Sequence, residues 1–226
     1  PKRLLSIKKM TNFAAVKMKS ELDVFKNVPV QTAAIASLYP DIKAGKKKVA
    51  SLEKANKIIR LKRGLYVVNP KESGLLVSTE LIGNMLYGPS YVSMMTALRF
   101  YGLIPEYVAI TESMTIHLRR TFDTPLGRFE YYHCAKEYYQ IGIRQEATEG
   151  INFLMATPEK ALCDYISTTP YLPLRFIKDT YTFLEEDLRF DMDAFEDMDI
   201  SIFKQCAATG KKQQFINNII KLKEKL

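Results

Sequence analysis

Residues 58–70 read IIRLKRGLYVVNP, and this stretch decides how the first third of the chain is interpreted. Apolar and basic side chains alternate from Ile59 to Lys62, which is the period-two pattern of a half-buried strand. Gly64 supplies the positive φ that a tight turn needs, and Leu65–Val68 returns as a second strand. Proline cannot extend a strand ladder, so Asn69–Pro70 ends it. The stretch therefore predicts a β-hairpin with positive charge at its tip.

Three helical patterns precede this hairpin. Apolar residues recur at helical spacing over residues 2–26, and a short helix with Thr32 as its cap follows at 32–38. A third helix runs from Lys43 or Ala44 to Asn56. Helix, helix, turn, helix and hairpin, in this order, predict a winged helix-turn-helix whose third helix enters a DNA major groove.

The lysines and arginines of the third helix and the hairpin are the predicted DNA-binding residues. Lysine and arginine neutralise phosphates and release counterions, and the planar guanidinium of arginine matches phosphate oxygens. The alternative interpretation is that these charges only keep a surface solvated. The predicted set is Lys43, Lys46, Lys47, Lys48, Lys54, Arg60, Lys62 and Arg63.

Charge is distributed unevenly along the 226 residues, whose overall net charge is +8. Residues 1–70 contain 16 basic and 4 acidic side chains, whereas residues 71–226 contain 17 basic and 21 acidic side chains. Such asymmetry is typical of a nucleic-acid-binding module joined to a second domain. The second part also holds an acidic stretch at 185–199 and a basic tail at 211–225.

The remainder of the chain mixes helical and strand patterns, which predicts an α+β fold. Thr157-Pro158-Glu159 is a strong helix start, with a cap, a proline at the first position and an acid near the positive end of the dipole. The predicted helices cover 75–87, 93–101, 157–167, 174–188 and 200–226 with a break at Gly210. The predicted strands cover 108–110, 115–118, 128–133, 142–147 and 150–155. We therefore expect two domains, 1–70 and 71–226.

Four ordered motifs carry a resemblance to a known family. They are RGLYVV at 63–68, YVSMMTALRFYGLIPE at 91–106, TPLGRFEYYH at 124–133 and ATPEKALCD at 156–164. Together they resemble the AbiEi family, the antitoxins and transcriptional regulators of type IV, abortive-infection toxin–antitoxin systems. The resemblance extends from about residue 29 to about residue 184.

The resemblance implies a function as well as a fold. It implies an N-terminal winged helix followed by a C-terminal antitoxin domain of mixed α/β structure. The protein would bind double-stranded operator DNA upstream of its own operon and repress that operon. It would also counteract a nucleotidyltransferase-like toxin without needing a stable complex with it. On this view the protein is not an enzyme, has no catalytic or metal site and needs no cofactor.

Two other classes of function remain open from the residues alone. Glu149, Glu159 and Asp164 suggest a carboxylate cluster of a metal-dependent, nucleic-acid-processing enzyme targeted by the winged helix. In the purely structural interpretation, Glu159 is an acid that stabilises the helix N-terminus, and Lys160 is its solvated neighbour. His117 and His133 are either a metal pair on facing strands or structural residues. A third possibility is a protein-interaction module whose acidic stretch meets a basic partner.

Aromatic residues and cysteines complete the sequence evidence. Phe129, Tyr131, Tyr132, Tyr138 and Tyr139 either stack on nucleic-acid bases or form core and cross-strand pairs, and we favour the core. The three cysteines are widely spaced, which favours a reducing cytoplasm over a disulfide framework. No uncharged apolar run reaches 18 residues, so we expect no membrane-spanning helix.

Overall fold

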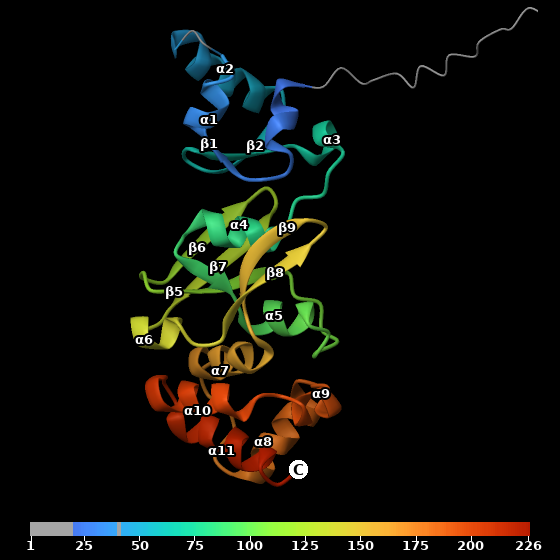
Figure 1. The fold of residues 1–226 in the computed structure, drawn as a ribbon, viewed down its shortest axis with the longest axis vertical. Helices are drawn as coiled ribbons and strands as arrows, with labels where there is room; N and C mark the ends of the chain where they lie inside the picture. The colour runs from blue at the N-terminus through green and yellow to red at the C-terminus, as the bar shows by residue number, and fades with distance from the viewer. Residues whose placement is uncertain (1–19, 40–41) are drawn as a thin grey trace, which may run out of the picture.

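The computed structural model describes residues 20–39 and 42–226, without the side chains at positions 42–44 and 46. The described chain has a mixed α+β fold, as predicted, with two separate β-sheets. The molecule is elongated, with the small N-terminal sheet and its helices at one end and the C-terminal helices at the other (Figure 1). No helix among the described residues is both long and apolar enough to cross a bilayer.

The N-terminal unit is a three-stranded sheet with short helices on one face. All pairings are antiparallel, and the last strand in sequence lies in the middle, giving the order β1-β3-β2. The elements are a 3₁₀ turn η1 (Glu21–Phe25), β1 (Val30–Gln31), α1 (Thr32–Ala36), α2 (Ile42–Lys54), β2 (Ile58–Lys62) and β3 (Leu65–Val68). The hairpin predicted from residues 58–68 is thus present, and Gly64 adopts the expected positive φ of 87°.

The helices of this unit differ in detail from the prediction. Most of the helix predicted at 2–26 lies outside the described residues, and its described end is the 3₁₀ turn η1. Thr32 is the first residue of α1 instead of its cap; Gln31 occupies the cap position without a side-chain hydrogen bond. Gly45 is buried inside α2, where an added Cβ would lie 3.3 Å from the Ala36 Cβ. The glycine therefore allows α1 and α2 to pack closely, which offsets its poor helix propensity.

Strand β3 is buried on both faces of its sheet. Tyr66 and Val68 pack against α1 and α2 in the core of the N-terminal unit. Leu65 and Val67 point the other way, into a second cluster that includes Leu86 and residues of the large sheet. This second cluster, which we call the junction cluster, consists of Leu61, Leu65, Val67, Ile82, Leu86, Phe129 and Tyr131. An alternating strand with two apolar faces explains why Leu65–Val68 is a continuous hydrophobic run.

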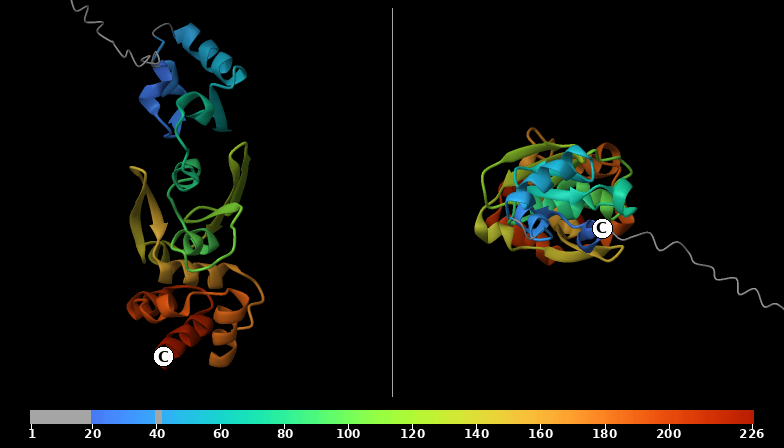
Figure 2. Two further views of the ribbon diagram at one scale, coloured as in Figure 1. Left: turned by 90° about the vertical axis from the view of Figure 1, so that its right-hand side faces the viewer. Right: turned by 90° about the horizontal axis from the view of Figure 1, so that it is seen from above.

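The second unit contains a mixed six-stranded sheet in the order β6-β7-β5-β4-β9-β8. Strands β5 and β7 pair in parallel, as do β4 and β9, and the other pairs are antiparallel. The strands are β4 (Ser90–Val92), β5 (Ile110–Thr115), β6 (Arg120–Thr124), β7 (Gly127–His133), β8 (Ile143–Thr148) and β9 (Ile151–Ala156). The β6–β7 and β8–β9 hairpins rise on opposite sides of helix α4, towards the N-terminal unit (Figure 2, left).

Helices lie above and below this sheet in the view of Figure 1. After the short α3 (Pro70–Ser73), α4 (Thr79–Leu86) lies on the side of the N-terminal unit, whereas α5 (Met94–Phe100) and α7 (Pro158–Thr168) lie on the opposite side (Figure 1). The remaining elements are α6 (Lys136–Tyr139), α8 (Ile177–Thr182), a π-helical turn η2 (Phe183–Asp187), α9 (Met192–Glu196), α10 (Ile200–Thr209) and α11 (Gln213–Lys223). Their apolar faces join the sheet in the main core of the molecule.

Several boundaries in this unit differ from the prediction. The strands predicted at 108–110 and 115–118 are wrong as two elements, because a single strand β5 spans Ile110–Thr115. The helix predicted at 174–188 begins at Ile177 and changes to a π-helical turn at Phe183. The predicted helix start at Thr157 is confirmed: its hydroxyl oxygen accepts a hydrogen bond from the Lys160 N–H. The break at Gly210 is also confirmed, between α10 and α11.

Candidate nucleic-acid interface

Helix α2 presents a basic face at the end of the molecule. Val49 and Leu52 are buried against the N-terminal core, whereas Lys47, Lys48 and Lys54 are exposed. The Lys48 ammonium lies 5.3 Å from the centre of the Tyr39 ring. The helix also contains the two predicted positions Lys43 and Lys46, whose side chains lie outside the described residues. The described lysines of α2 are thus free to meet a polyanion in solvent.

Arg60 lies on the face of the hairpin that is turned towards α2, and not at the tip of the hairpin. Its guanidinium donates a hydrogen bond to the Glu53 carboxylate at 2.6 Å and lies 5.6 Å from the centre of the Tyr66 ring. Donation of this hydrogen bond to Glu53 is the main cause that raises the pKa of Arg60. About half of the arginine side chain stays exposed. Arg60 therefore links β2 to α2, and its charge is partly balanced within the protein.

Lys62 points away from the predicted DNA surface. Its Nζ donates a hydrogen bond of 2.6 Å to the carbonyl oxygen of Leu86, the last residue of α4. The carbonyl groups at a helix C-terminus are unsatisfied and carry partial negative charge, so an ammonium group is stabilised there. Binding a phosphate would require this amine to leave α4. The structure therefore gives Lys62 a partner in the second unit.

Arg63 occupies the hairpin turn and is exposed. The neighbouring Gly64 carbonyl accepts a hydrogen bond of 2.9 Å from the Thr32 N–H, which holds the turn beside the start of α1. In the part of the chain that the structure describes, no carboxylate lies within ion-pair distance of Arg63. Of the three hairpin cations, Arg63 is the one whose charge is most available to a ligand.

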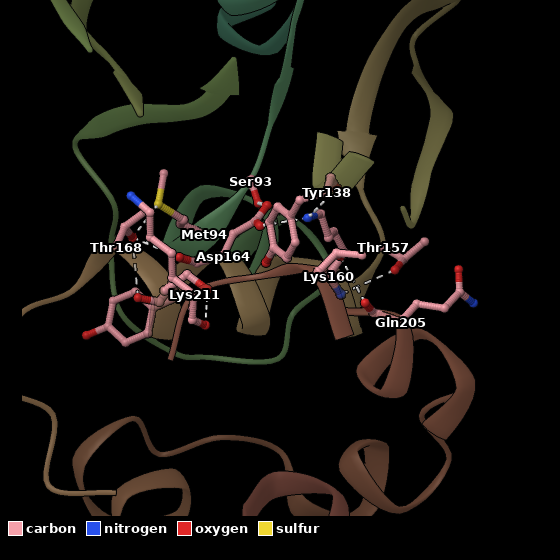
Figure 3. Close-up of polar contacts among 12 residues, drawn as sticks. Ser93, Met94, Tyr138, Thr157, Lys160, Asp164, Thr168, Gln205 and Lys211 are labelled. Carbon is pink, nitrogen blue, oxygen red and sulfur yellow. Dashed lines mark hydrogen bonds and ion pairs between the residues drawn. The ribbon is translucent and has the colours of Figure 1, made fainter. Parts of the chain in front are cut away.

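The second unit contains a buried ion pair that the sequence did not reveal. Lys160 was predicted to be solvated, which is wrong: its side chain and that of Asp164 are both fully buried. The Lys160 Nζ lies 3.0 Å from the Asp164 Oδ1 and donates to the Tyr138 carbonyl oxygen at 3.1 Å. The other Asp164 oxygen, Oδ2, accepts a hydrogen bond of 2.6 Å from the Ser93 hydroxyl (Figure 3). These contacts join α5, α6 and α7.

All three cysteines lie in the core around this ion pair, and each is a buried free thiol. Burial is the largest cause of the raised pKa of Cys134, which is about 12. Burial also raises the pKa of Cys163 well above its ordinary value. The thiolate is the nucleophilic form of cysteine. Cys134 and Cys163 are therefore held as inert thiols at neutral pH.

The carboxylates considered for an enzyme lie in separate environments. Glu159 is buried and accepts a hydrogen bond from the Asp199 N–H at 3.0 Å, at the start of α10. Glu149 is exposed in the turn between β8 and β9. Asp164 is bound to Lys160 and Ser93. Within residues 20–39 and 42–226, no group of three or more His, Cys, Asp or Glu side chains is arranged to hold a metal ion.

The two histidines and the aromatic run are also placed. His117 follows β5, and its carbonyl oxygen lies 3.1 Å from the Nδ1 of His133 at the end of β7. The expected core role is confirmed for Phe129, Tyr131 and Tyr138, each almost fully buried. These rings therefore contribute to the interior of the protein.

Glu112 is a titratable residue that the sequence did not single out. Its carboxylate accepts a hydrogen bond of 3.1 Å from the Met95 N–H at the start of α5. Burial raises its pKa to about 7, and the nearby Glu130 carboxylate acts in the same direction. Sequence spacing does not identify such a residue, because the burial of Glu112 arises from the packing of α5 across β5.

A scan against protein-family models gave no match to the chain. A search among curated proteins gave no significant match either. The arrangement of charges on α2 and the hairpin therefore provides the main evidence on function.

Proposed function

We propose that this protein is a DNA-binding transcriptional regulator that represses its own operon. The observation that carries the proposal is the exposed basic face of α2, formed by Lys47, Lys48 and Lys54, together with Arg63 in the adjoining hairpin. Cations that lack balancing carboxylates attract the DNA backbone and release its counterions.

The order of elements supports a winged helix-turn-helix in the N-terminal unit. Helices α1 and α2 pack against a small antiparallel sheet whose last two strands form a hairpin. In such a module the second helix of the pair enters the major groove and the hairpin flanks the backbone. On this proposal α2 reads the operator, and Arg63 contacts a phosphate beside it.

We further propose that the second unit acts as the antitoxin of a type IV toxin–antitoxin system. Support comes from the resemblance of the motifs at 91–106, 124–133 and 156–164 to the AbiEi family. The toxin would be nucleotidyltransferase-like, and counteracting it would not require a stable complex. The protein is then a non-enzymatic regulator that needs no cofactor and works in the cytoplasm.

The DNA-binding proposal is tested by fluorescence anisotropy. The labelled duplex carries the DNA upstream of the gene, the comparison duplex is a scrambled sequence, and binding is measured at several salt concentrations. We expect tighter binding to the upstream DNA. The double variant Lys47→Gln/Lys48→Gln should reduce the slope of log affinity against log salt by about 2, since each phosphate contact contributes about 0.9.

A matched control separates a local interface from general charge. The double variant Lys221→Gln/Lys225→Gln removes the same charge from α11 and the residues after it, at the far end of the molecule (Figure 1). We expect this control to bind DNA as the wild type does. Equal losses in the two double variants would contradict an interface on α2.

The antitoxin proposal is tested separately, by co-expression with the product of the neighbouring gene. We expect the wild type to relieve growth arrest caused by that product. The Lys47→Gln/Lys48→Gln variant should lose repression of an operon reporter and still relieve the arrest. If the wild type gives no relief, the antitoxin assignment fails while the DNA-binding assignment stands.

A further inference from the structure

The second unit contains a pocket that DNA binding leaves unused. It has a volume of about 280 Å³ and lies where β5 and β7 end, close to the C-terminus of α7 and the α10–α11 connection. Strands β5 and β7 are parallel, so both carboxyl ends meet at this edge of the sheet. In open α/β sheets, ligands bind outside the carboxyl ends of parallel strands.

The inner wall of the pocket is apolar. Met114, Cys134 and Tyr138 line it, and each is at most 5% exposed. Gly210 closes one side, because the α10–α11 connection passes directly over the Tyr138 ring. A Cβ at this position would lie only 2.6 Å from the Tyr138 Cε2. The wall thus offers apolar side-chain atoms, among them the Met114 thioether, to an apolar part of a ligand.

The mouth of the pocket is positively charged. Arg119 and Lys211, which belong to different segments of the chain, both line the mouth. Among the described residues, no carboxylate lines the pocket. The Arg119 guanidinium lies 4.7 Å from the centre of the Tyr132 ring, another lining residue. Its nearest acid, Glu130, lies 3.8 Å away and is already bonded to Arg128 at 2.9 Å. Lys211 is exposed, and no acid within the described part of the chain pairs with it.

The threonine hydroxyl groups that line the pocket donate their hydrogen bonds to backbone carbonyl groups. The Thr168 hydroxyl donates to the Asp164 carbonyl at 2.8 Å, and the Thr209 hydroxyl donates to the Gln205 carbonyl at 3.0 Å. Their oxygens still accept hydrogen bonds, but their donors are used. Strong donors for a bound anion therefore come from Arg119 and Lys211.

We propose that this pocket binds a small anion that carries an aromatic ring. The ring lies against the apolar wall formed by Met114, Cys134 and Tyr138, and the negative group meets Arg119 and Lys211. A volume of about 280 Å³ suits a compact ligand, since it lies just below the usual range of small-molecule sites. A carboxylate and a phosphate both satisfy this pair of cations. The proposal does not depend on the function assigned to the N-terminal unit.

The test is isothermal titration calorimetry on the full chain with three probes. Salicylate supplies an aryl carboxylate, adenosine 5′-monophosphate supplies a phosphate on a ring system, and adenosine is the uncharged comparison. We expect at least one of the anions to bind with a Kd below about 1 mM and adenosine to bind far more weakly. Whichever anion binds more tightly identifies the charged group. If neither anion binds, the proposal is overturned.

Variants connect any binding to this pocket. Arg119→Gln and Lys211→Gln should each weaken binding about tenfold or more, because each removes a charge-assisted hydrogen bond. Lys136→Gln is the matched control: Lys136 is exposed beside the lining residue Ala135, but it does not line the pocket. We expect Lys136→Gln to leave the affinity unchanged. An equal loss in Arg119→Gln and Lys136→Gln would mean only general surface attraction and would overturn the site.

A fourth variant tests the cavity itself without changing charge. Ala135 lines the pocket and is exposed, so a larger side chain there enters the open space at little cost to folding. Ala135→Phe should abolish binding while the melting temperature stays close to that of the wild type. Unchanged binding in this folded variant would place the ligand elsewhere and contradict the proposal.

Discussion

The Lys160–Asp164 pair illustrates how much a single buried charge depends on its partner. Both side chains are fully excluded from solvent; Lys160 also donates to the Tyr138 carbonyl, and Asp164 also accepts from the Ser93 hydroxyl. A buried charge is tolerated only when a partner and hydrogen bonds compensate for lost hydration. The two residues are therefore expected to tolerate joint replacement better than the loss of one.

We expect Asp164→Asn to lower the free energy of unfolding by about 3–5 kcal/mol, since the Lys160 charge would be left buried without its counterion. The joint apolar replacement Lys160→Met/Asp164→Leu should cost less than Asp164→Asn alone. Urea denaturation of the three proteins measures both differences. A larger loss in the double variant would show that shape and hydrogen bonding at this site matter more than charge balance.

Glu112 links stability to pH at a single residue. Its pKa in the folded protein is raised from 4.5 to about 7, chiefly by burial. A carboxyl group with a raised pKa stabilises the fold fully below pH 4.5, and that contribution disappears as the pH rises to 7. Ionisation in the folded protein therefore costs up to about 3 kcal/mol above pH 7.

The variant Glu112→Gln removes the ionisation while keeping an oxygen that accepts from the Met95 N–H. We expect its melting temperature to gain on that of the wild type between pH 4.5 and pH 7, and the difference to stay constant above pH 7. Glu137→Gln, at an exposed position, is the control and should show no such trend. A difference that is independent of pH would contradict the assignment.

At the scale of elements, the β2–β3 hairpin combines two roles that its sequence does not separate. Lys62 and Arg63 are adjacent, basic and equally plausible as phosphate ligands. In the structure, Lys62 reaches the carbonyl at the end of α4, whereas Arg63 stays exposed in the turn. The direction of each side chain is set by the pleat and by the second unit.

We expect Arg63→Gln to reduce the salt slope of DNA binding by about 1 and to leave the melting temperature nearly unchanged. Lys62→Met should do the reverse, lowering the melting temperature through the lost bond to Leu86 and leaving the salt slope intact. Anisotropy and thermal unfolding on both variants provide the comparison. A salt slope reduced equally by Lys62→Met would return this lysine to the DNA-binding set.

Elements with strong local signals could be predicted from the sequence, and elements that depend on packing could not. The turn at Gly64 and the helix start at Thr157 carry their own chemistry and appear as expected. Strand β5 was divided because Thr111, Glu112 and Ser113 are polar, yet the sheet and α5 bury two of these three residues. The same reason hides the Lys160–Asp164 pair: a spacing of four residues fits a solvated helix face equally well.

At the scale of the whole molecule, the junction cluster joins the two units, because side chains of β2 and β3 pack against side chains of α4 and β7. Leu61 faces the junction cluster, whereas Ile58 on the same strand β2 faces the core of the N-terminal unit. The same short strand therefore serves two cores. Coupling of this kind makes neighbouring parts unfold together.

We expect the wild type to unfold in one calorimetric transition and Leu61→Ala to separate it into two, because the variant weakens only the junction. Ile58→Ala, on the other face of the strand, should lower the midpoint without separating the transition. Each substitution removes buried methyl groups at a cost of about 2–5 kcal/mol. Two transitions in the wild type would show that the junction does not couple the units.

The double-sided burial of β3 also affects how the protein can be divided for study. A fragment ending at Pro70 would contain the whole predicted DNA-binding module, but Leu61, Leu65 and Val67 would become surface residues on one open sheet. An exposed apolar face of this kind favours aggregation during expression. Polar replacements at these three positions would be needed before the fragment could be purified as a well-behaved monomer.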